Sequence, residues 1–183
     1  MHDARIDALA RQLVRYSTAL KKGEKVLIDL YDVPDSIGLA LIREVRAKGA
    51  FPFIRIHQAR LTREMLKGAE DDQYSIVAKH LLAEMRDMDA YIAVRGGHNI
   101  SETSDVPAPK MQLAMKHMRP VLDHRVKKTR WCVLRWPSPS MAQQANMSTE
   151  AFEDFYFNVC LLDYKALVPS MNALKKLMEA TDR

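Results

Sequence analysis

Short apolar runs alternate with amphipathic segments along the first three quarters of this chain. The amphipathic segments carry apolar residues three or four positions apart, as at Ile6, Leu9 and Leu13, which is the spacing of one helix face. Helices are therefore expected at 6–20, 34–48, after a cap at Thr62, around 74–85 and at about 110–122. The apolar runs predict strands at 25–30, 51–57, 89–95 and 130–136. This alternation predicts an α/β fold with a mostly parallel, doubly wound (Rossmann-like) sheet of about four or more strands.

The last quarter of the chain has a different pattern. From Ser140 onward the spacing is helical only, with apolar faces at 149–162 and 167–178. We therefore expect one α/β domain over residues 1–183, with a helical C-terminal segment. Because the last helix is followed by no strand, the pattern also predicts a truncation at a domain boundary.

Doubly wound sheets bind ligands at the carboxyl ends of their strands. The third expected strand ends in Arg95-Gly96-Gly97-His98-Asn99, which combines a cation, two glycines, a histidine and an amide. Such a set suits contact with a carboxylate or a phosphate. An equal alternative is a tight turn in which His98 and Asn99 satisfy backbone groups of the loop.

The usual catalytic motifs are missing. The sequence has neither a Gly-x-Gly-x-x-Gly motif nor a Gly-Lys-Ser/Thr phosphate loop, and its six glycines leave little room for a nucleotide loop. It lacks the His-Glu-x-x-His zinc motif and the Gly-x-Ser-x-Gly nucleophile motif. His80 and Glu84 form half a metal site at most, and a site built from His57, His98 and loop acids is a minor alternative. The sequence thus predicts no catalytic and no metal-binding residues in this chain.

Composition describes an ordinary globular protein, with 48% hydrophobic and 28% charged residues. No apolar run reaches the roughly 18 residues of a membrane helix, and the N-terminus lacks the pattern of a signal peptide. The two cysteines, Cys132 and Cys160, stand among apolar residues, which favours buried thiols in a reducing compartment. We therefore expect a cytoplasmic protein without a membrane partner.

The formal net charge is +5, and much of the basic charge lies in residues 116–135. This segment holds Lys116, Arg119, Arg125, Lys127, Lys128, Arg130 and Arg135. One hypothesis is a stand-alone module that binds nucleic acid or another anion through this segment. The favoured interpretation is a solvated helix end, because aromatic residues are not interleaved as in single-strand binders, so nucleic acid is an unlikely partner.

Three stretches carry a more specific pattern. These are 95–99 followed by Ser104-Asp105-Val106-Pro107, the opening Lys22-Gly23-Glu24-Lys25-Val26-Leu27-Ile28, and above all Trp136-Pro137-Ser138-Pro139-Ser140-Met141-Ala142-Gln143. Over essentially its whole length the chain resembles the N-terminal half of the thermophilic-type metalloaminopeptidases, the aminopeptidase T and aminopeptidase S family. Ser138 stands where that family more often has threonine.

The resemblance implies an enzyme that removes N-terminal residues from peptides with two divalent metal ions of the zinc or cobalt type. It also implies a cytoplasmic homodimer whose glutamate, histidine, tyrosine and aspartate ligands lie in a separate C-terminal catalytic domain. None of those ligands matches a position in this chain. The expected role here is a non-catalytic domain that supports the catalytic domain and walls the substrate cavity, with Arg95, His98 and Asn99 lining that cavity.

Overall fold

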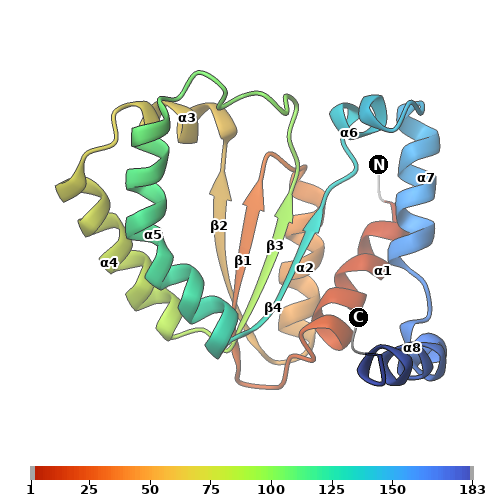
Figure 1. Ribbon diagram of the computed structural model, residues 1–183. Coiled ribbons are helices and arrows are strands. Elements are labelled where there is room, and N and C mark those ends of the chain that lie inside the picture. The colour runs from red at the N-terminus through yellow and green to blue at the C-terminus, as the bar shows by residue number, and fades with distance from the viewer. Residues whose placement is uncertain (1–2, 182–183) are drawn as a thin grey trace.

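A computed structural model describes residues 3–181 of the chain. Its centre is a sheet of four parallel strands in the order β2-β1-β3-β4 (Figure 1). The strands are β1 (Lys25–Tyr31), β2 (Phe51–His57), β3 (Ala90–Arg95) and β4 (Arg130–Arg135). The predicted parallel, doubly wound α/β fold is confirmed. Because the chain proceeds from β1 to one edge and then returns to β3, the carboxyl ends of β1 and β3 form the topological switch point of the sheet.

Helices cover both faces of this sheet (Figure 1). One face is covered by α1 (Ala4–Gln12), its π-helical continuation η1 (Leu13–Ser17) and α2 (Asp35–Ala47), with α7 (Thr149–Cys160) packed outside them. The other face is covered by α4 (Asp71–Arg86) and α5 (Ala108–Lys128). The short helices α3 (Ala59–Lys67) and α6 (Pro139–Gln144) lie near the carboxyl edge of the sheet, and α8 (Tyr164–Glu179) follows α7.

The two faces of β1 build two apolar cores. Val26, Ile28 and Leu30 pack with α1 and α2, whereas Leu27 packs toward α4 and α5 with Tyr91 of β3. Residues 26–30 are therefore all buried, as expected for a central strand of a parallel sheet. One of these five residues is charged, namely Asp29.

Three predicted helix boundaries are wrong: the end of the first helix, the start of the third, and the end of the fifth, which continues to Lys128 instead of about 122. The first helix ends at Ser17 instead of position 20, because the Thr18 hydroxyl donates to the Leu13 carbonyl at 2.9 Å and Ala19 then adopts a left-handed φ of 44°. The third helix begins at Ala59, so Thr62 lies inside α3 and does not cap it. The carboxylate of Asp32 accepts a hydrogen bond from the Ala59 N–H and thereby satisfies the start of α3.

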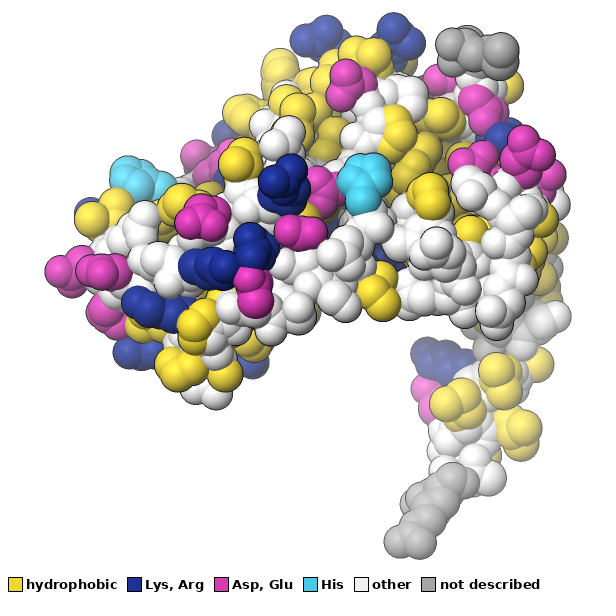
Figure 2. All heavy atoms as spheres, turned by 90° about the horizontal axis from the view of Figure 1, so that it is seen from above, with side chains coloured by type: hydrophobic (Ala, Val, Ile, Leu, Met, Phe, Trp, Pro, Cys, Tyr) yellow, Lys and Arg dark blue, Asp and Glu magenta, His cyan; other side chains and the backbone are white. Residues whose placement is uncertain are grey.

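Some apolar side chains remain outside both cores. On the edge strand β2, Phe51, Phe53, Ile54 and Ile56 are exposed. Helix α8 has no buried residue and projects from the body of the molecule, with hydrophobic side chains along it (Figure 2). Within residues 3–181, no helix is both long enough and apolar enough to cross a membrane.

Candidate functional site

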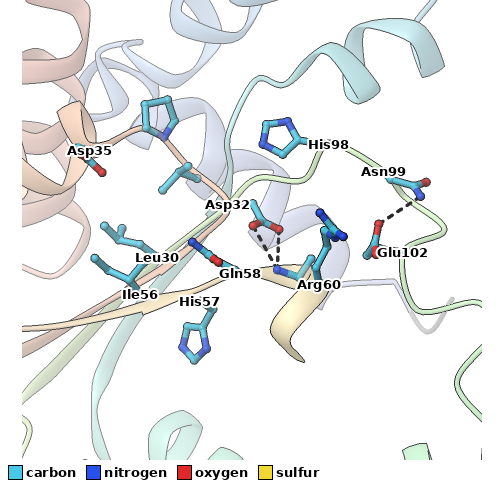
Figure 3. A pocket seen from close by; sticks show the side chains of 13 residues that line it. Leu30, Asp32, Asp35, Ile56, His57, Gln58, Arg60, His98, Asn99 and Glu102 are labelled. Carbon is cyan, nitrogen blue, oxygen red and sulfur yellow. Dashed lines mark hydrogen bonds between the residues drawn. The ribbon is translucent and has the colours of Figure 1, made fainter. Parts of the chain in front are cut away.

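Three neighbouring cavities lie along the carboxyl edge of the sheet. The histidine cavity, about 550 Å³, is lined by His57 and His98 among others (Figure 3). The arginine cavity, about 420 Å³, is lined by Arg95, Gly96, Gly97, Asn99, Ile100, Arg135, Ser138, Ser140, Met141 and Gln144. A third cavity of about 410 Å³, which we call the inner cavity because it shares residues with both others, is lined by Tyr31 and Thr103 among others. The three cavities share lining residues and lie at the switch point, where ligands of doubly wound folds bind, and we refer to them together as the hollow.

Asp29 is the anchor of a buried polar network beneath this hollow. It lies in the middle of β1 and only 3% of it is exposed. Its carboxylate accepts hydrogen bonds from the Tyr91 hydroxyl at 2.6 Å, the Tyr31 hydroxyl at 3.1 Å and His57 Nε2 at 2.6 Å. Because a carboxylate only accepts, the Nε2 of His57 carries the proton in this contact. Asp29 therefore fixes side chains from three strands.

The network holds Asp29 as a carboxylate. Burial on its own raises the pKa of Asp29, but the hydrogen bonds from His57 and Tyr91 outweigh this effect, so the pKa lies below its usual value. The same environment raises the pKa values of the two tyrosine hydroxyls. Burial, followed by the charge of Asp29, raises the pKa of Tyr91 to about 12 and raises the pKa of Tyr31 strongly. Both tyrosines are consequently neutral donors at physiological pH.

Tyr31 connects the hydrogen-bond network around Asp29 to two side chains at the rim of the hollow, through contacts of its ring. One ring contact is to His57, stacked at a centroid distance of 4.1 Å and an interplanar angle of 5°. The other is to Arg95, whose Cζ lies 5.4 Å from the Tyr31 centroid, which is a cation–π contact. Arg95 is thus oriented by a ring whose hydroxyl is bonded to a buried carboxylate.

A close backbone approach shapes the switch point itself. A Cβ atom at Gly96 would stand 2.4 Å from the backbone oxygen of Asp32, so only glycine fits there. Asp32 has a left-handed φ of 45°, a conformation that aspartate tolerates better than most residues. The loops after β1 and β3 therefore meet without a side chain between them.

The three predicted lining residues all reach this hollow. Arg95 lines the arginine and inner cavities, His98 lines the histidine cavity, and Asn99 lines both the histidine and the arginine cavities. The alternative prediction of a backbone-satisfying turn also holds for Asn99, since its Oδ1 accepts the Ser101 N–H at 3.0 Å. His98 and Asn99 are exposed, whereas Arg95 is half-buried.

Several residues of this region were missed from the sequence. Asp29 had a usable signal, because a lone carboxylate inside an otherwise apolar strand needs buried donors. For Arg135 the sequence signal was weaker and consisted only of its position at the end of the fourth strand. No local pattern indicates that Tyr31, His57 and Tyr91 converge on one carboxylate, because they come from three different strands.

The basic segment 116–135 does not form one surface. Lys127, Lys128 and Arg130 lie around the amino end of β4, whereas Arg135 lies at its carboxyl end. Three of the seven cations form ion pairs with carboxylates, namely Lys116 with Asp71, Arg119 with Asp123 and Arg130 with Glu24. No repeating basic stripe results, so nothing in this arrangement favours the nucleic-acid hypothesis.

The family model described as thermophilic metalloprotease (M29) matches residues 2–181. The chain belongs to the M29 family. This confirms the resemblance seen in the sequence. A search of curated proteins finds no match.

Among solved structures, wild-type AmpT from Thermus thermophilus has a TM-score of 0.67 at 17% identity, over 86% of this M29 chain and 43% of its own. At that identity the likeness shows the fold alone, and this chain spans less than half of the relative. VinN has a TM-score of 0.34 at 12% identity, over 81% and 26% of the two chains. An alcohol dehydrogenase superfamily protein from Novosphingobium aromaticivorans also scores 0.34, at 16% identity over 90% and 49%. With TM-scores this low, neither of the last two structures supports a conclusion about this chain.

The part of this M29 chain that the structure describes does not fit a metal pair. Across residues 3–181, no three histidine, cysteine, aspartate or glutamate side chains come together as ligands. The strongest partial set, Asp29 with His57, already uses its carboxylate to accept three hydrogen bonds. Two-metal hydrolysis needs carboxylates or histidines bridging ions about 3.5–4 Å apart. No catalytic step through a metal is therefore derived for this chain.

Proposed function

We propose that this chain is the N-terminal, non-catalytic domain of a divalent-metal-dependent aminopeptidase that removes N-terminal residues from peptides. The observation that carries the proposal is that the M29 family model matches essentially the whole chain, while the described residues offer no set of metal ligands. The two metal ions, of the zinc or cobalt type, would be held by a catalytic domain outside this chain.

In this proposal the domain walls one side of the substrate cavity. The support is the hollow at the switch point, which is lined by Arg95, His98 and Asn99 and held in place by the network around Asp29. A rigid wall of this kind admits extended peptides more readily than folded proteins. It also restricts where one end of a bound peptide can lie, which favours a reactive orientation at the catalytic domain.

The partners are then the catalytic domain of the same enzyme, its peptide substrates and a second copy in a homodimer. Helix α8 supports the first of these. Its apolar face is exposed in the isolated chain and includes Leu167, Val168, Met171, Leu174, Leu177 and Met178. Apolar faces of this kind usually mark an interaction surface. The free thiols of Cys132 and Cys160 support a cytoplasmic location, because disulfides are rare there.

The direct test is hydrolysis of leucine p-nitroanilide by the purified 183-residue chain, titrated with zinc and cobalt. No metal-dependent release of p-nitroaniline is expected, and calorimetric titration should detect no micromolar metal binding. Turnover that a chelator abolishes would refute the non-catalytic role. As an independent check, the gene region that follows the Arg183 codon is expected to encode a domain with glutamate, histidine, tyrosine and aspartate ligands.

A further inference from the structure

Two arginines stand side by side at the carboxyl edge of the sheet. Arg95 of β3 and Arg135 of β4 are paired in register, so their side chains leave the sheet on the same face. Both line the arginine cavity and both line the inner cavity. Within residues 3–181, neither arginine has an acidic side chain within ion-pair distance. Two cations that line the same cavities favour an anion between them.

The protein fixes the position of the Arg95 side chain before any ligand binds. Its guanidinium is oriented by the Tyr31 ring, and its Nε atom is buried without a hydrogen-bond partner. A guanidinium held in this way by the protein can donate from its terminal nitrogens to a carboxylate or phosphate oxygen. Arg135 is exposed and lies on the open side of the same cavity. The pair therefore offers one fixed and one adaptable donor.

The rest of the arginine cavity distinguishes between anions. The Ser140 hydroxyl donates to the Gly97 carbonyl at 2.6 Å, so the bond of 2.9 Å between the two serines is donated by Ser138. Both serine hydrogens are therefore used within the protein, and the serine oxygens can only accept. A peptide N–H can donate to such oxygens, whereas the unprotonated oxygens of an inorganic phosphate cannot.

Apolar lining and size favour the same ligand. Ile100 and Met141 lie in the cavity beside the polar groups. The volume of about 420 Å³ is more than ten times the share of one water molecule in the liquid, about 30 Å³. A single small anion would leave most of it unfilled, whereas a terminal amino-acid residue supplies a carboxylate, an N–H and a side chain together.

We propose that Arg95 and Arg135 bind the free α-carboxylate at the C-terminal end of a peptide. The inference rests on the proposed function, since it takes peptides as the substrates, and it adds the end of the peptide that this domain holds. Substrates would then be short peptides with a free carboxylate, because their length must span the distance between this pocket and the catalytic domain.

The test measures binding to the 183-residue chain by isothermal titration calorimetry. The probes are the tripeptide Leu-Gly-Phe with a free carboxylate, the same tripeptide with a C-terminal amide, and inorganic phosphate. We expect the carboxylate form to bind at least tenfold more tightly than the amide form or phosphate. Equal affinity for the amide, no binding of the carboxylate form, or tighter binding of phosphate would overturn the proposal.

Arg135→Gln is the informative variant, because Arg135 is exposed and forms no ion pair whose loss would unfold the chain. It should weaken binding of the free tripeptide at least tenfold. Arg43→Gln on α2 is the matched control, since it removes the same charge from an exposed position away from the cavity and should leave the affinity unchanged. Equal weakening of binding by both variants would indicate a general charge effect and would overturn the proposal that Arg135 binds the carboxylate directly. This experiment measures binding and not hydrolysis. A failure of the carboxylate proposal can therefore be told apart from a failure of the proposed non-catalytic role.

Discussion

The guanidinium of Arg95 lies over the ring of Tyr31, 5.4 Å from its centroid, and the hydroxyl of Tyr31 is bonded to the buried carboxylate of Asp29. This relationship joins the interior of β1 to the rim of the candidate site. A residue with no access to a ligand thus determines where the cation at the rim points.

Asp29→Asn is expected to lower the free energy of unfolding by about 1–3 kcal/mol. The amide presents an NH₂ group to donors from Tyr31, Tyr91 and His57, so at least one of them loses its acceptor. Urea denaturation followed by circular dichroism measures the loss. Asp87→Asn, at an exposed position after α4, is the control and should change stability by less than about 0.5 kcal/mol. Equal stability of the two variants would contradict the anchoring role of Asp29.

Stability should fall at acidic pH, in part through Asp29. Its pKa is lowered in the folded state, so the carboxylate favours folding above the unfolded-state pKa of about 3.9. That contribution is lost as the pH falls through this value toward the lower folded-state value. Unfolding free energies measured between pH 7 and pH 3 should therefore decrease less steeply in Asp29→Asn than in the wild type. Parallel curves for the two proteins would show that Asp29 contributes nothing to the acid dependence.

Gly96→Ala and Gly97→Ala form a matched pair. At Gly96 the new Cβ would meet the backbone oxygen of Asp32 at 2.4 Å, so the loops must separate, at a cost of about 1–3 kcal/mol. At Gly97 nothing lies within 4 Å of the new Cβ, and φ is outside the left-handed region, so alanine should be neutral or stabilise by up to about 1 kcal/mol. Thermal unfolding of both variants measures the difference. A Gly96→Ala variant as stable as Gly97→Ala would refute the close approach.

Deletion of residues 164–183 should leave the remaining domain folded. Helix α8 buries none of its residues, so its removal is expected to change the unfolding free energy by less than about 1 kcal/mol. Phe157→Ala in α7 is the contrasting variant, because Phe157 lies in the core and its truncation should cost about 3–5 kcal/mol. Loss of the cooperative transition on deletion of α8 would mean that the helix is part of the folding unit.

The apolar face of α8 should cause self-association of the isolated chain. Sedimentation velocity is expected to show an average mass that rises with concentration, and Leu174→Glu should suppress the rise. Asn172→Glu adds the same charge to the same helix outside that face, so it should leave the association intact. A strictly monomeric wild-type chain at high concentration would argue that this face needs no partner.

Much of the architecture was predictable from local pattern. β2 was predicted with its observed boundaries, and the other three strands to within one residue at either end, because each is a short apolar run bounded by turn residues. Helix boundaries were less predictable, and one of them depends on a group far away in the sequence. Helix α3 begins at Ala59 because Asp32, 27 residues earlier, accepts its first N–H. Helix α6 begins at Pro139, one residue before the helical spacing that the sequence showed from Ser140 onward.

The sequence by itself determined the α/β class, the family and the strand end at which Arg95, His98 and Asn99 stand, since these depend on local periodicity and on short motifs. Only the tertiary structure decided that Asp29 gathers Tyr31, Tyr91 and His57, and that Arg135 stands beside Arg95. Parallel strands meet only through long crossovers, so residues 28 to 62 positions apart become neighbours. The charges and hydrogen bonds that make the candidate site belong to that assembly, because no single segment contains them.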